Sequence, residues 1–240
     1  MKHKEIFFNP FRMLSPRLES EAVRLDELYK APVSETISLE QGLLTMISKL
    51  IQVTRLVHKS IFSGSTAQME ECERMIQEVR DQERFLTSGV FELGIKGVLL
   101  KGVIRFPYRL TRIGDLLQAI LKCSQVKNEN GIPFSDKAHG ELDCIFELLV
   151  QMMINLRDAF ITPNKTLLEA TLRDTKNMYQ LLADARVAHW DRLEAGYCAV
   201  AAGPIFLQIL DASKLMNEYI EKMCHTLLEL RDTAESIAEG

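Results

Sequence analysis

Apolar residues recur every three or four positions along most of this chain, which is the period of an amphipathic α-helix. Leu, Met, Glu and Arg, all good helix formers, dominate the periodic segments, and strand-like alternation is nearly absent. Glycine and proline separate these segments. The pattern predicts six long helices, at residues 38–62, 66–94, 104 or 107–124, 136–161, 165–195, and 204 or 205–237.

Two of these segments carry an apolar seam of the kind that packs helices together in bundles. The first seam consists of Leu43, Ile47, Leu50, Val57 and Ile61, and Thr54 occupies its one polar position. In the second, the seam consists of Leu142, Ile145, Leu149, Met152 and Leu156.

The arrangement of helices repeats within the chain. Three helices are followed by the polar stretch QVKNENGIPFS and then by three more helices, with Phe62 matching Phe160 and Asp115 matching Asn217. An internal duplication of this kind changes the expected fold. We therefore predict an all-α fold of two pseudo-symmetric three-helix bundles with up-down-up connectivity. The predicted divisions are an N-terminal arm at 1–33, a first bundle at 34–130 and a second bundle at 131–240.

Composition narrows the function classes. The net charge of −4 is mild and does not favour nucleic-acid binding, which needs clustered Lys and Arg. The five cysteines form no C-x-x-C pair, so neither a disulfide framework nor a four-cysteine zinc site is expected. Free thiols fit a reducing compartment, so we expect a cytoplasmic protein. No apolar run reaches the roughly 18 residues of a membrane span, and the N-terminal apolar run is too short for a signal peptide.

A glycine–aspartate pair, Gly114-Asp115, lies inside the predicted third helix, where glycine costs about 1 kcal/mol relative to alanine. The residues from Arg112 to Asp115 resemble the third-helix signature of the PhoU family and of its relatives at the tail of sodium/phosphate cotransporters. That signature reads approximately Asp-Leu-Glu-Arg-Ile-Gly-Asp. A second match is to the family's His-x-x-Arg-Leu-x-x-Gly-x-Cys run, and it comprises His189, Arg192, Leu193, Gly196 and Cys198. The resemblance covers residues 35–238 and implies a PhoU-like, six-helix fold.

The resemblance also implies multinuclear iron or zinc sites, since each family signature places two acidic residues four positions apart on one helix face. Here Thr111 replaces the first acid and Asp115 is kept, while Ser213 and Asn217 replace both acids of the second copy. Neutral oxygens attract a dication weakly. We therefore expect no cofactor, with iron or zinc near Asp115 as the alternative.

In the absence of a metal, Asp115 is expected to pair with Arg109 or Arg112, in a surface contact worth about 0–1 kcal/mol. Gly114 would then be explained by the close approach of another helix backbone.

No nucleophile, base and orienting group occur together in the sequence, so we predict that the protein is not an enzyme. His189, Trp190 and Asp191 are neighbours on a helix and point in different directions, which makes His189 a packed or capping residue. Glu-x-x-His turns, which di-iron bundles require, are absent.

The function implied by the resemblance is that of a regulator or adaptor of phosphate transport or phosphate signalling, acting through helical-surface contacts. Its expected partners are a phosphate transporter or a sensor kinase at the membrane, with homodimer formation as a further expectation. The alternatives are a protein that binds iron or zinc near Asp115, and a structural dimerisation module unrelated to phosphate.

Overall fold

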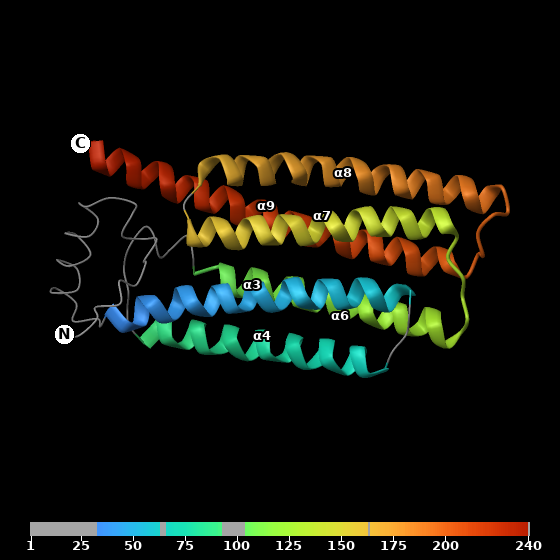
Figure 1. Ribbon diagram of the computed structural model, residues 1–240, viewed down its shortest axis with the longest axis horizontal. Coiled ribbons are helices and arrows are strands. Elements are labelled where there is room, and N and C mark those ends of the chain that lie inside the picture. Colours follow the sequence, from blue (N-terminus) through green and yellow to red (C-terminus); the bar gives the residue numbers. More distant parts are fainter. Residues whose placement is uncertain (1–32, 63–65, 93–103, 163, 240) are drawn as a thin grey trace, which may run out of the picture.

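The computed structural model describes residues 33–62, 66–92, 104–162 and 164–239. The predicted all-α architecture is confirmed, because within these ranges the chain forms six long helices that lie side by side along one axis (Figure 1). They are α3 (Val33–Phe62), α4 (Thr66–Glu92), α6 (Phe106–Glu129), α7 (Asp136–Ile161), α8 (Lys165–Glu194) and α9 (Ala202–Glu239).

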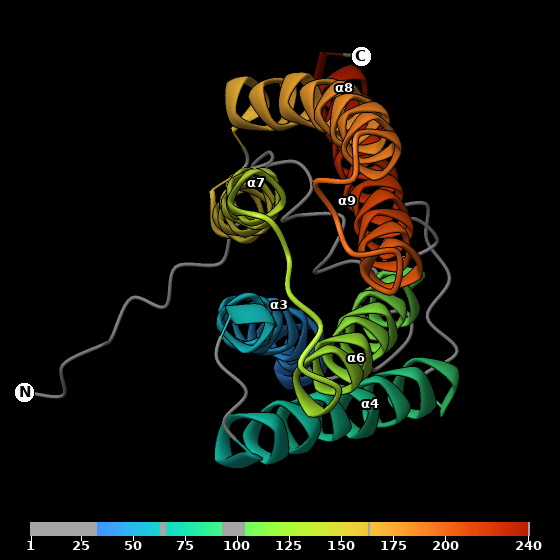
Figure 2. The same ribbon diagram turned by 90° about the vertical axis from the view of Figure 1, so that its right-hand side faces the viewer.

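The helices pack as two groups of three. Helices α3, α4 and α6 contact one another, as do α7, α8 and α9, and the two groups meet where α3 packs on α7 and α6 packs on α9. Figure 2 shows the resulting order, with α4 and α8 outermost and the other four helices between them. The domain boundaries after residues 33 and 130 stay a prediction, and residues 1–32 of the predicted arm lie outside the described residues.

Both predicted seams form the core. Their apolar side chains are fully buried, as expected for the contact faces of helices in a bundle. The polar seam residue Thr54 is also buried, and its Oγ1 donates a hydrogen bond to the carbonyl of Leu50 at 2.8 Å. That bond satisfies the hydroxyl inside an apolar environment, so one threonine does not interrupt the seam.

Local sequence signals explain where the helices of the second half begin and end. Ser135 caps α7 by accepting a hydrogen bond from the Ala138 amide at 3.3 Å, and Asn164 caps α8 from the Leu167 amide at 3.2 Å. Gly196 follows α8 with φ of +74°, a conformation that favours glycine. The predicted limits of these two helices agree with the structure to within one residue.

Four predicted helix limits differ from the structure. Helix α3 begins at Val33 rather than 38, and α9 spans Ala202–Glu239, slightly beyond its predicted limits. Helix α6 continues to Glu129 instead of stopping at Ser124. The polar residues after Ser124 are compatible with a helix, which ends only where Gly131 adopts φ of +60°. The predicted end of α4 at residue 94 lies outside the described residues.

Candidate functional site

Asp115, the retained signature acid, is held by two arginines. It projects from α6 toward α4, where its Oδ1 accepts hydrogen bonds from Arg80 Nε at 3.2 Å and Nη2 at 2.8 Å. Its Oδ2 accepts one from Arg112 Nη1 at 2.8 Å. Arg80 Nη2 also donates to Gln118 Oε1 at 2.6 Å. Both carboxylate oxygens are therefore already engaged by guanidinium groups, which is the strong, charge-assisted form of hydrogen bond.

Of the two arginines expected to pair with Asp115, Arg112 does so and Arg109 does not. Arg109 Nη1 instead donates to the Lys222 carbonyl at 3.0 Å and to Thr226 Oγ1 at 3.1 Å, both on α9. Arg109 lies six residues, or about 1.7 turns, before Asp115, so its side chain leaves a different face of α6 and reaches across the contact between the two bundles.

The sequence did not single out Arg80. It lies within a highly charged segment of α4, and 35 positions separate it from Asp115. Only the packing of α4 on α6 distinguishes it from its charged neighbours.

The close approach of a helix backbone that we expected at Gly114 is not found in the described structure. An added Cβ there would lie 3.5 Å from Leu50 Cδ2 and 3.6 Å from Ile76 Cγ2, which are side-chain atoms of α3 and α4. These are ordinary van der Waals distances, so none of the helix backbones described here approaches closely enough to require glycine.

Of the other three signature positions, Thr111 lies one turn before Asp115 on α6, and Ser213 and Asn217 lie one turn apart on α9. Ser213 and Asn217 are fully buried on α9, where Asn217 Nδ2 donates to the Thr175 carbonyl of α8 at 3.0 Å. The buried atoms Thr111 Oγ1, Ser213 Oγ and Asn217 Oδ1 have no hydrogen-bond partner among the described residues. The first signature therefore faces α4, and the second faces α8 on the opposite side of the molecule (Figure 2).

These side chains do not fit the iron or zinc site that the family resemblance implies. Asp115 carries the only signature carboxylate, and the positive charge beside it is supplied by Arg80 and Arg112. In the described part of the chain, no three His, Cys, Asp or Glu side chains come close enough to hold a metal ion. The assignment of a metal to Asp115, Thr111, Ser213 and Asn217 stays a prediction.

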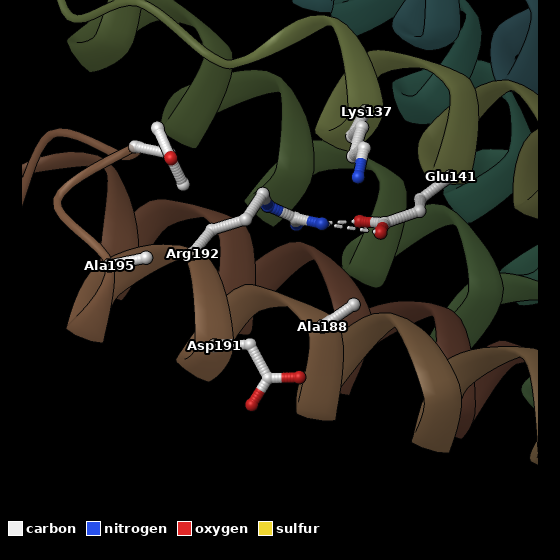
Figure 3. A pocket seen from close by; sticks show the side chains of 7 residues that line it. Lys137, Glu141, Ala188, Asp191, Arg192 and Ala195 are labelled. Atoms are coloured by element: carbon white, nitrogen blue, oxygen red, sulfur yellow. Dashed lines mark hydrogen bonds and ion pairs between the residues drawn. The ribbon is translucent and has the colours of Figure 1, made fainter.

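A hollow of about 490 Å³ lies between the first turns of α7 and the last turns of α8 (Figure 3). Arg192 crosses its floor with a side chain only 8% exposed, and its two terminal nitrogens donate to the Glu141 oxygens at 2.6 and 2.7 Å. This bidentate pair joins α8 to α7. The hollow is lined by Lys137, Glu141, Ala188, Asp191, Arg192, Ala195 and Tyr197.

His189 is a packed residue, as predicted. It is fully buried and stacks on Phe206, with ring centroids 4.7 Å apart, and its Nδ1 lies 4.0 Å from Cys198 Sγ. Burial is the main cause that lowers the pKa of His189, with the nearby Arg192 charge acting in the same direction.

The run from His189 to Cys198 that resembles the PhoU family thus builds the end of α8 and its packing on α9. The Tyr197 amide closes that end by donating to the Arg192 carbonyl at 2.8 Å.

Large apolar side chains are exposed around the end of α8. Val187 and Trp190 are 61% and 51% exposed on the helix, and Tyr197 and Val200 are 78% and 82% exposed in the connection to α9. We call these four residues the α8 patch. Tyr197 also lines the hollow, and exposed large apolar side chains of this kind are candidates for protein contacts.

None of the helices within the described ranges is both long enough and apolar enough to cross a membrane.

Comparison with solved structures identifies the fold. The crystal structure of PhoU from Pseudomonas aeruginosa matches with a TM-score of 0.75 and 14% identity, over 83% of this chain and 98% of that one. The phosphate transport system regulatory protein PhoU from Streptococcus pneumoniae matches with a TM-score of 0.71 and 16% identity, over 80% and 92% of the two chains. No protein-family model matches the sequence, and no curated protein matches it significantly. The chain therefore has a PhoU-like fold.

Proposed function

We propose that this chain is a PhoU-like regulator of phosphate transport or phosphate signalling that acts through protein contacts and performs no catalysis. The observation that carries the proposal is the likeness in fold to two PhoU proteins over most of the chain, with both three-helix groups present. One of these relatives is named as a regulatory protein of a phosphate transport system. The partner we expect is a phosphate transporter or a sensor kinase at the inner face of the membrane.

The non-enzymatic part of the proposal is supported by the state of three polar side chains at or beside the hollow. Arg192 and Glu141 are bound to each other, and the His189 ring is buried with its imidazole away from solvent. A general acid or base must reach its substrate within hydrogen-bond distance. In this arrangement neither the Arg192–Glu141 pair nor the His189 ring can reach a substrate in that way.

The contact surface we propose is the α8 patch together with the adjoining hollow. Aromatic residues contribute most strongly to binding when they are buried at the centre of an interface. Trp190 and Tyr197 are the two exposed aromatic residues of the patch, so we expect them to be the anchors.

The proposal is tested by capturing partners with the full chain as bait, from native cells grown at low and at high phosphate, with crosslinking and mass spectrometry. We expect a phosphate transporter subunit or a sensor kinase whose recovery changes with phosphate. Deletion of the gene is expected to alter uptake of radiolabelled phosphate, and the intact chain should restore it. If no partner depends on phosphate and uptake is unchanged, the structural dimerisation module becomes the better interpretation.

The surface has a matched control. A Trp190→Ala, Tyr197→Ala double variant should lose partner recovery at least about tenfold, which corresponds to 1.4 kcal/mol. Phe85, which is 65% exposed on the distant helix α4, provides the control, and Phe85→Ala should leave recovery unchanged. Equal loss in both variants would contradict the assignment of the surface while leaving the regulatory proposal in place.

Elemental analysis of protein purified without chelator tests the metal-binding alternative. Iron or zinc bound near one equivalent, and lost in Asp115→Ala, would support a metal near Asp115. A metal content near zero would remove that alternative, which is the result we expect from the two arginines on its carboxylate.

A further inference from the structure

Two histidines and two phenylalanines form a continuous ring cluster at the end of the molecule where α6 connects to α7 and α8 connects to α9 (Figure 1). The Phe134 ring centroid lies 5.9 Å from that of His139 and 5.8 Å from that of Phe206. Phe206 in turn stacks on His189 at 4.7 Å. We call His139, Phe134, Phe206 and His189 the ring cluster. It joins the start of α7 to the end of α8 and the start of α9, and Phe62 of α3 packs against it with its ring centroid 4.8 Å from that of His139.

Within the described structure, neither imidazole has a polar partner at Nε2. The Nε2 atoms of His139 and His189 are buried and have no hydrogen-bond partner among the described residues. At His189 the neighbouring wall is the backbone of α9, since a Cβ added at Gly203 would lie 3.4 Å from Nε2. A charged imidazolium would place two N–H donors in each ring, and the one at Nε2 would find no acceptor.

The cluster already holds two positive charges. Lys127 Nζ lies 5.2 Å from the Phe134 ring centroid, and the Arg192 guanidinium carbon lies 5.8 Å from that of Phe206. Each cation is attracted by the face of its ring. A proton on either histidine would add a third positive charge to the same stack of rings.

The acidic groups near His139 contribute little to stabilising a protonated ring. Asp136 and Asp143 of α7 favour its charged form, but Asp143 Oδ1 is 2.7 Å from His58 Nε2 of α3. Burial, with Lys127 of α6 acting in the same direction, lowers the pKa of His139.

A protonated His189 would also gain little stabilisation from its acidic neighbour. Glu141 of α7 favours its charged form, but both Glu141 oxygens are bound by Arg192 of α8. The remaining polar neighbour is the Cys198 thiol of the α8–α9 connection, 4.0 Å from Nδ1. His189 therefore packs as a neutral ring. Its neighbours are Arg192, which is already paired with Glu141, and the α9 backbone at Gly203.

We propose that the ring cluster is a proton-sensitive latch, which holds the α6–α7 and α8–α9 connections together while both imidazoles are neutral and releases them in acid. This regulation is independent of the proposed function, because it rests only on the contacts at this end of the molecule. Release would also disturb the hollow, since Arg192 contributes to both.

The direction of the pH dependence follows from proton binding. The pKa of each histidine is lowered from its ordinary value of 6.5 in the closed state, so the open state binds more protons. The closed state is therefore fully stabilised above pH 6.5 and loses stability as pH falls through and below that value.

Hydrogen exchange of the full chain at pH 7.5 and pH 5.5, corrected for intrinsic exchange rates, tests the proposal. We expect about tenfold faster exchange at the lower pH in peptides from residues 126–146 and 189–210, and no comparable change in α4. A His139→Gln, His189→Gln variant should keep its protection at pH 7.5 and lose the acid response. His225→Gln, at an exposed position of α9 far along the helix from Phe206, should retain the response.

Equal protection of the natural protein at both pH values would overturn the latch, as would an acid response that persists in the double variant. If the double variant does not fold, NMR titration of the two imidazoles in the natural protein decides the matter. Both should titrate below pH 6.5, and titration at or above 6.5 would overturn the proposal.

Discussion

Replacing Gly114 by alanine should stabilise the protein, although this glycine is buried within a family signature. Glycine inside a helix costs about 0.5–1 kcal/mol relative to alanine because it loses more backbone freedom on folding. The added Cβ would make ordinary contacts with Leu50 and Ile76, at 3.5 and 3.6 Å, so no steric cost offsets this gain. We expect Gly114→Ala to raise the free energy of unfolding by about 1 kcal/mol.

The same substitution at Gly42 of α3 should have the opposite effect. There a Cβ would lie 2.7 Å from Leu86 Cδ2 and 2.9 Å from Gln82 Nε2, which is closer than contact distance. Leu86 is itself buried, so its side chain would have to shift within the packed interior. Overpacking of this kind costs about 1–3 kcal/mol, which exceeds the gain in helix propensity. The two variants therefore form a matched pair that differs only in the space around the new methyl group.

Thermal unfolding followed by circular dichroism, with urea unfolding as a second measurement, checks the pair. A change of 1 kcal/mol shifts the midpoint of a chain of this size by about 2–4 °C. Gly114→Ala should therefore raise the midpoint by about that amount, and Gly42→Ala should lower it. A lower midpoint for Gly114→Ala would refute the packing argument and would indicate that this position requires glycine for a reason outside the contacts described.

Three further predictions concern buried polar groups and thiols. Glu141→Gln removes the charged partner of the buried Arg192 and should lower the free energy of unfolding, measured in urea, by about 2–4 kcal/mol. Ser213→Ala removes a buried hydroxyl that has no partner in the described structure, so stability in the same assay should be unchanged or higher by about 1 kcal/mol. Burial raises the pKa of the Cys72 thiol to about 11, so a thiol reagent applied to the folded protein should label the exposed Cys144 far faster than Cys72, as measured by peptide mass spectrometry.

The sequence alone was sufficient to predict the helices and the core. The two apolar seams repeat with the helical period, and every apolar residue assigned to them is buried. Helix ends were predicted best where a capping residue or a glycine marks them, as at Ser135, Asn164 and Gly196. The end of α6 was missed because its last turn is polar, although Lys127 within it packs over the Phe134 ring.

The environment of the signature residues depended on tertiary structure. The sequence shows that Asp115 is the one retained acid, and it offers Arg112 and Arg109 as equally plausible partners. Packing of α6 against α4 and α9 directs Arg109 to α9 and brings Arg80 to the carboxylate instead. In the second half, the covering helix α8 buries Ser213 and Asn217.

Periodicity is a property of each helix by itself, so the sequence can reveal which face of a helix is apolar and where the helix stops. Contacts between side chains of different helices depend on how each helix is rotated and how far it is shifted along its axis. Those two quantities are determined by the packing of all six helices together, because the interior must be filled without voids or overlaps. For that reason the core could be predicted from the chain, whereas the Arg80–Asp115 pair and the ring cluster could be recognised only in the folded molecule.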